Sequence, residues 1–140
     1  GSNFGSLQKC IRSLPELSFF VAENFLVSAM LLGARGCCSS VVYWYPEFAF
    51  SLYAKAEAGQ WEEAVALQKA LDALFAELDV FMEACGLGGF DPAVDKGVAL
   101  ATGVFVGHPR VRPPYIGWTP EEVEKVRDWL RTREDLLDLS

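Results

Sequence analysis

The stretch LSFFVAENFLVSAMLLGARGCCSSVV, residues 17–42, decides the fold of this chain. Its two ends, residues 17–22 and 36–42, are short apolar runs without polar alternation, which is typical of strands covered on both faces. Between them, residues 24–33 fit one short helix, with Asn24 able to cap its start and a glycine at its end. A crossover of this length predicts a parallel strand pair with a right-handed connection.

Helical patterns flank this stretch on both sides. Thr119, Pro120 and Glu122 supply the cap, the first-turn proline and the reciprocal glutamate of a capping box, so a helix is expected over 120–131. Residues 103–118 hold three prolines and predict an irregular connector. The other predicted segments are helices over 6–14, 46–59, 61–85 and 91–102, the last capped by Asp91, and a frayed tail at 134–140.

Two parallel strands alone form a sheet whose edges have no hydrogen-bonding partners. Both edges of such a sheet lack partners, and Val21, Cys38 and Val42 are expected on an apolar face that nothing in the chain covers. Three outcomes are open: the strands belong to a larger sheet, another chain completes them, or the strand assignments are wrong. The apolar, β-branched content of the second strand argues against the third.

Composition excludes several classes of partner. The chain has 140 residues, is 51% apolar and carries a net charge of −7, so a nucleic-acid partner is not expected. No run approaches the roughly 18 apolar residues that a membrane span needs. Cys10, Cys37, Cys38, Cys85 and His108 fall at no metal-ligand spacing, and reduced, buried thiols in a cytoplasmic protein are expected.

Four segments occur in a characteristic order and spacing. They are residues 17–47, 56–74, 95–103 and 110–130, and their most specific parts are LGARG (32–36), GQW (59–61) and RPP (112–114). Together they resemble the C-terminal half of the dihydrodipicolinate synthase and N-acetylneuraminate lyase family, whose members are (β/α)8 TIM barrels with an added helical domain. The resemblance implies an α/β fold in which residues 1–59 are the last βα units of the barrel and residues 60–140 the helical C-terminal domain.

The resemblance also implies a reaction. Family members form a Schiff base between a lysine and pyruvate or another 2-oxo acid, without a metal or other cofactor. The lysine and a catalytic tyrosine are expected upstream of residue 1, so this chain is expected to contain no catalytic residue and to be inactive alone. Its lysines all fall on predicted helices rather than at strand ends; they are Lys9, Lys55, Lys69, Lys96 and Lys125. The partners expected are therefore a 2-oxo acid and either the missing barrel half or further copies of the chain.

The candidate substrate-binding residues lie within the second strand and at the ends of both strands. In parallel βα units, ligands meet the strand ends that lead into the next helices, which here are Glu23-Asn24 and residues 42–45. The resemblance places a substrate-binding turn after the first strand, and near Cys38 a backbone carbonyl that faces the lysine. Tyr43-Trp44-Tyr45 stands where family members have smaller residues. These aromatic residues could accommodate a bulky 2-oxo acid or could pack a helix against the barrel, and the sequence leaves both alternatives open. The predicted set is Glu23, Asn24, Cys38, Ser39, Ser40 and Tyr43.

Two alternatives belong to other classes. Residues 56–74 look like one tetratricopeptide unit, which would make the chain a helical binding module. Such modules need about three stacked copies at a period near 34, and no second copy is present. The other alternative is a non-catalytic homologue that keeps this part of the barrel for assembly.

Overall fold

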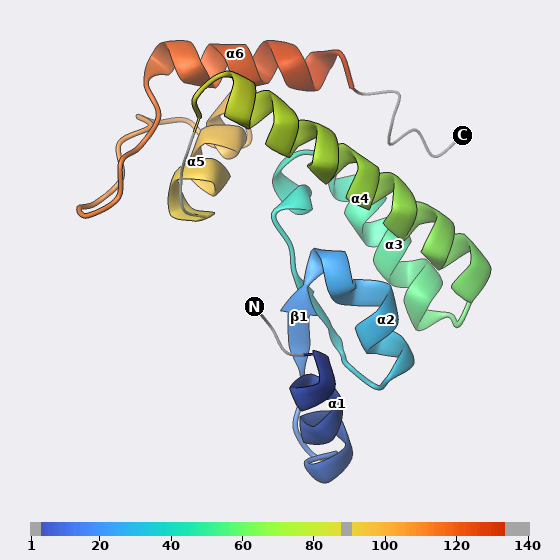
Figure 1. Ribbon diagram of the computed structural model, residues 1–140. Coiled ribbons are helices and arrows are strands. Elements are labelled where there is room, and N and C mark those ends of the chain that lie inside the picture. The colour runs from blue at the N-terminus through green and yellow to red at the C-terminus, as the bar shows by residue number, and fades with distance from the viewer. Residues whose placement is uncertain (1–3, 88–90, 134–140) are drawn as a thin grey trace.

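The computed structural model describes residues 4–87 and 91–133 (Figure 1). Its elements in chain order are α1 (Phe4–Ser13), β1 (Phe20–Ala22), the 3-10 helix η1 (Glu23–Phe25), α2 (Leu26–Leu31), β2 (Gly36–Cys38), the 3-10 helix η2 (Val41–Tyr43), α3 (Pro46–Glu57), α4 (Trp61–Ala84), α5 (Asp91–Ala101) and α6 (Pro120–Arg131). The predicted helices are thus confirmed to within a few residues. The predicted tail at 134–140 and the capping side chain of Asp91 lie outside the described part of the chain.

The two strands pair in parallel, as the crossover predicts. Val21 is the Cα partner of Cys37, and the sheet has the order β1–β2. Both strands are shorter than predicted. Before β1, the Leu17 amide donates to the Leu14 carbonyl in a turn, at 3.1 Å. After β2, the Ser39 hydroxyl accepts from the Val41 amide at 3.2 Å. These local hydrogen bonds hold the backbone in turns and so compete with the ladder.

The crossover begins differently from the prediction and ends as predicted. Asn24 lies inside η1 and does not cap α2, whose start at Phe25 has no side-chain cap, so that prediction was wrong. At the other end Gly33 has φ +106°, a conformation that favours glycine. The Ala34 amide donates to the Ala29 carbonyl at 2.9 Å and the Gly33 amide to Met30 at 3.0 Å, which is a Schellman motif.

One face of the sheet is covered and the other is open. Val21 packs with the buried residues Ile11, Ala29 and Ala34, so the expectation that Val21 lies on the uncovered face was wrong. Because side chains alternate along a strand, Phe20 and Cys38 share the opposite face, and both are exposed. Val42 is not in the strand at all but in η2. The uncovered apolar face is therefore present, and of the three residues predicted for it only Cys38 lies there, together with Phe20.

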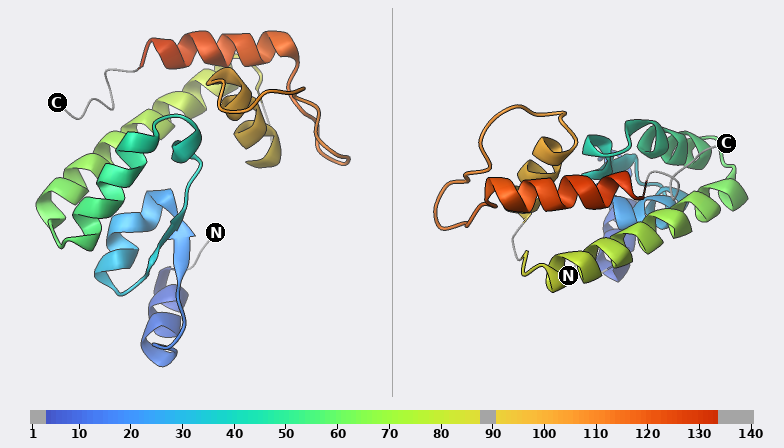
Figure 2. Two further views of the ribbon diagram at one scale, coloured as in Figure 1. Left: turned by 180° about the vertical axis from the view of Figure 1, so that it is seen from behind. Right: turned by 90° about the horizontal axis from the view of Figure 1, so that it is seen from above.

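The larger of two hydrophobic clusters joins the strand region to the helical region. Phe48 and Leu52 of α3 pack in one buried cluster with Leu71 and Leu74 of α4, and α3 and α4 lie side by side in both figures. The same cluster includes residues of α5 and α6, and α6 crosses the end of α4 (Figure 2). The boundary predicted near residue 60 thus falls within a shared core, and its status as a domain boundary stays a prediction.

The capping box predicted at the start of α6 is present in the structure. The Glu122 amide donates to the Thr119 hydroxyl at 3.2 Å, and the Thr119 amide to the Glu122 carboxylate at 2.6 Å, which confirms the capping box.

All four cysteines are free. Cys10 and Cys38 are exposed and the other two are half-buried, so the expectation of buried thiols was wrong because β2 and α1 each leave one face open. No helix among the described residues is long and apolar enough to span a membrane.

Candidate functional site

A cavity of about 940 Å³ lies where the two strands end. Its walls come from the residues that follow β1, the residues that follow β2, and the facing sides of α1, α4 and α5. The sequence-predicted residues that line it are Glu23, Asn24, Cys38, Ser39, Ser40 and Tyr43, which is the complete predicted set. The structure therefore brings all six together, while their role in binding stays a prediction.

A chain of hydrogen bonds ties the two strand ends to α5. The Ser40 amide donates to Glu23 Oε1 at 2.9 Å, which links the residue after β1 to the turn after β2. The Ser40 hydroxyl donates to Asp95 Oδ1 at 2.7 Å, which links that turn to α5. Because its single hydroxyl proton is used by Asp95, Ser40 Oγ can face a ligand only as an acceptor.

Gln68 on α4 supports the same turn from behind. Its amide nitrogen donates to the Glu23 carbonyl at 3.2 Å, and its amide oxygen accepts from the Val27 amide at 3.5 Å. The α2 start lacks a side-chain cap of its own, and Gln68 supplies one from a distant helix. The position of Glu23 thus depends on α4 as well as on β1.

The two cysteines of β2 differ in their surroundings. Cys38 is exposed and lines the cavity. Burial raises the pKa of the Cys37 thiol from 9.0 to about 11, and the nearby Glu23 and Cys38 add to the rise. Cys37 is therefore a protonated thiol at neutral pH and is not an activated nucleophile.

Sequence reasoning missed the contribution of the helical region to the cavity. Asp72, Phe75, Ala76 and Asp79 line it from α4, and Asp95 lines it from α5. The α4 residues recur at three- and four-residue spacing, so they share a face of the helix. That spacing was a usable signal, whereas nothing in the local sequence marks Asp95 as a partner of Ser40.

The part of the cavity lining that the structure describes carries carboxylates but no amine. It includes four acidic side chains and no lysine or arginine. Each lysine lies in a helix of the structure, as predicted from sequence, and Lys96 donates to the Arg110 carbonyl at 2.6 Å. Among the described residues, no group of three metal-ligating side chains could hold a metal ion. This lining offers a ligand the carboxylate acceptors, the hydroxyls of Ser39, Ser40 and Tyr43, a side-chain amide and backbone groups.

Solved structures of related architecture match this chain. An N-acetylneuraminate lyase from Fusobacterium nucleatum is 17% identical with a TM-score of 0.61, and the match covers 95% of this chain and 42% of that chain. A catalytic lysine mutant of a Ruminococcus gnavus sialic acid aldolase is 22% identical with a TM-score of 0.68, covering 97% and 43%. YagE, a prophage protein of the dihydrodipicolinic acid synthase family from E. coli K12, in complex with pyruvate, is 17% identical with a TM-score of 0.65, covering 94% and 43%.

These matches define the class of fold. The neighbours are TIM-barrel aldolases and lyases, and this chain matches their C-terminal part, which confirms the fold that the resemblance implied. The chain spans less than half the length of these structures. No family model matches the sequence, and no curated protein matches it either. At these identities the likeness establishes the fold, and the activity is a separate question.

Proposed function

We propose that this chain forms one wall of the active site of a Schiff-base-forming lyase that acts on pyruvate or another 2-oxo acid. The observation that carries the proposal is the meeting of the β1 and β2 ends in one cavity, on a fold matched by aldolases and lyases. In parallel βα architectures this is the edge where substrates bind. The amine that forms the Schiff base would come from residues outside this chain.

The lysines of the chain itself do not suit that role. An amine that attacks a carbonyl must lose its proton, which requires a desolvated setting. Lys9, Lys69 and Lys125 are exposed on helices, and Lys55 and Lys96 are half-buried on helices. None of them lines the strand-end cavity. In this proposal, this chain forms part of the cavity wall and orients the substrate, and residues outside the chain supply the reacting amine.

The hydrogen bonds suggest which residue meets the substrate carboxylate. Because the four acidic side chains of the cavity repel the substrate carboxylate, binding of that carboxylate needs a hydrogen-bond donor. Ser40 Oγ is an acceptor only, because its proton is directed to Asp95. Ser39 Oγ accepts from the Val41 amide and keeps its own proton for a ligand. Ser39 is therefore the candidate donor to the carboxylate of the 2-oxo acid.

The chain alone should not trap pyruvate. Incubation with excess pyruvate and borohydride, followed by intact-mass measurement, is expected to give no stoichiometric adduct, because no amine lies in the cavity. A single lysine modified in full would contradict the proposal, since it would place the reacting amine inside this chain.

Co-expression with any coding sequence that lies upstream of residue 1 in the same gene supplies the complementary test. The combined protein is expected to trap pyruvate on a lysine of the added part. Ser39→Ala should raise the pyruvate concentration needed for half-maximal trapping by about tenfold, as expected for loss of a hydrogen bond to a charged group. Ser39→Thr should restore it, and Lys125→Ala on α6 should leave it unchanged.

Absence of trapping in the combined protein would favour the second candidate function. A non-catalytic homologue would keep this fold for assembly and would not need the amine that the described residues of the cavity lack. A cytoplasmic location and assembly into homo-oligomers go with either candidate and are expectations from the sequence.

A further inference from the structure

A second cavity lies on the far side of the helical region. It has a volume of about 370 Å³ and is formed where α5 ends, beside α6 and the residues after η2. The arginine cavity, as we name it, is lined by Arg127, Arg131, Trp44, Tyr45 and Thr102 among others. It shares none of its lining residues with the strand-end cavity. We propose that the arginine cavity binds a small oxyanion, with phosphate as the chemical class.

Charge is the first argument for an anion. The chain carries a net charge of −7, and the strand-end cavity is lined by four carboxylates. Among the residues that the structure describes, the arginine cavity instead is lined by two guanidinium groups and no carboxylate. Their acidic partners Glu124 and Asp128 stand outside it, with side chains 59% and 75% exposed. Ion pairs to such exposed groups are weak and screened by salt, so the cavity keeps positive character.

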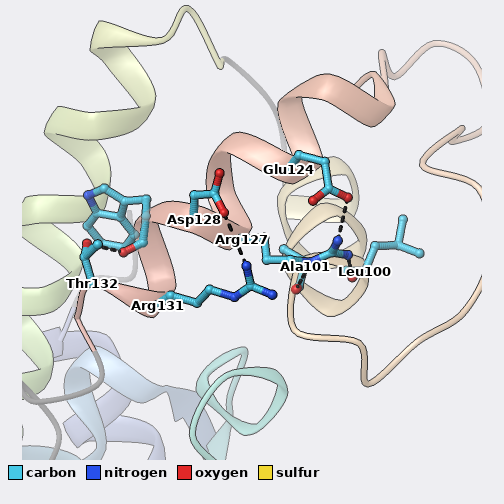
Figure 3. A network of polar contacts seen from close by, with 8 residues as sticks. Leu100, Ala101, Glu124, Arg127, Asp128, Arg131 and Thr132 are labelled. Atoms are coloured by element: carbon cyan, nitrogen blue, oxygen red, sulfur yellow. Dashed lines mark hydrogen bonds and ion pairs between the residues drawn. The ribbon is translucent and has the colours of Figure 1, made fainter.

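The geometry of Arg127 is the second argument. Its Nε donates to the Ala101 carbonyl at 2.7 Å and its Nη2 to the Leu100 carbonyl at 3.0 Å (Figure 3). These bonds fix the guanidinium plane at the end of α5. They also cover two carbonyls whose partial negative charge would otherwise repel an anion. Each terminal nitrogen of Arg127 retains one N–H beyond those used by Leu100 and Glu124.

Arg131 completes the positive pair. It lies four residues after Arg127 on α6, and both side chains reach toward the end of α5 (Figure 3). Like charges at this spacing repel one another on a helix. The contact of Arg131 Nη1 with Asp128 is long, at 3.4 Å, and most of its guanidinium donors lie outside that contact. An oxyanion between the two forks would remove the repulsion and accept from both.

The rest of the lining limits what can bind. The Tyr45 hydroxyl donates to the Leu130 carbonyl at 3.3 Å, which ties Tyr45 to the end of α6. Trp44 is buried and its indole nitrogen has no exposed surface, so it forms an apolar wall. A compact phosphate group, free or carried on a small monoester, matches this combination of volume and donors.

The test is a titration of the full chain at constant ionic strength. The side-chain Nε–Hε signals of Arg127 and Arg131 are followed by NMR while inorganic phosphate, or glycerol phosphate in a parallel series, replaces chloride. We expect saturable shifts of both signals. Arg131→Gln should weaken binding by about tenfold, as for loss of a charge-assisted hydrogen bond. Tighter binding of the ester would identify a phosphorylated metabolite as ligand, and equal binding would identify free phosphate.

Matched variants distinguish binding at a specific site from non-specific attraction by positive charge. Lys125→Gln removes the same charge from α6 at a residue outside the cavity and should leave the affinity unchanged. Arg127→Lys keeps the charge but lacks the planar fork, so it should also lose binding. Equal weakening by Arg131→Gln and Lys125→Gln, or shifts that never saturate, would overturn the proposal. This cavity is independent of the strand ends, so the result does not bear on the proposed lyase function.

Discussion

Cys37 and Cys38 are neighbours in β2 and meet opposite surroundings. Cys37 faces the hydrophobic core, whereas Cys38 is exposed on the open face of the sheet. Alternation along the strand predicts that the two point apart, and the structure confirms it. Alternation does not predict the reactivity of the two thiols, because the raised pKa of Cys37 results from its burial in the folded chain.

Thiol modification should distinguish these residues. At pH 8, iodoacetamide should alkylate Cys10 and Cys38 at least about tenfold faster than Cys37. The pKa of Cys37, about 11, leaves about 100-fold less thiolate than its usual value of 9.0, and higher intrinsic nucleophilicity offsets only part of that. Peptide mass spectrometry over a time course gives the rates.

The pH dependence of the alkylation rate tests the raised pKa of Cys37 directly. The rate at Cys37 should keep rising as pH increases toward 11, since the thiolate forms only there. In urea all four cysteines should react alike. A Cys37 rate equal to that of Cys38 in the folded chain would show that its burial has been misjudged.

At the scale of elements, α5 and the connector after it depend on a close approach. Gly97 lies in α5 against the ring of Trp118, and a Cβ at this position would overlap the indole. Trp118 is buried, so the ring cannot simply swing into solvent. The glycine is a poor helix former, and its presence in mid-helix is explained by this contact.

Gly97→Ala should therefore destabilise the chain. The gain in helix propensity, about 1 kcal/mol, is outweighed by overpacking of roughly 1–3 kcal/mol or more against a buried indole. Urea denaturation followed by tryptophan fluorescence measures the change. Gly5→Ala, at an exposed position in α1, is the matched control and should leave stability unchanged or slightly raised. Destabilisation of equal size in both variants would rule out the Trp118 contact as the cause.

At the scale of the whole molecule, the open sheet face is the dominant unsatisfied feature. Phe20 is 60% exposed on β1, and Leu17, just before the strand, is 53% exposed. Both strand edges lack partners in the described chain. Exposed apolar surface next to unpaired strand edges favours association with other chains.

We therefore expect the chain to self-associate at micromolar concentration. Phe20→Asp should shift the species observed by sedimentation velocity toward monomer, because the carboxylate would be buried in any contact through this face. Val80→Asp is the matched control, since Val80 is 69% exposed on α4 and is not part of the sheet. A sharp monomer peak for the unmodified chain would contradict the expectation.

The sequence by itself determined the helices, the parallel pairing and the identity of the candidate site residues. These depend on local signals: an apolar run, a proline at a helix start, the capping box at Thr119, and a glycine that ends α2. Strand ends in a parallel pair must meet at one edge, so Glu23 and the residues that follow the second strand are expected together. Ser40 lies inside the predicted strand 36–42 and enters the candidate set through the resemblance.

Only the tertiary structure decided which strand face is covered and which helices complete the site. Val21 faces α1 and α2 rather than the open side, because burial against helices outweighs the pattern of a strand that is apolar on both faces. The Ser40–Asp95 and Glu23–Gln68 contacts join residues 55 and 45 positions apart. Such pairs leave no local signal, since their partners are selected by how α4 and α5 pack on the shared core.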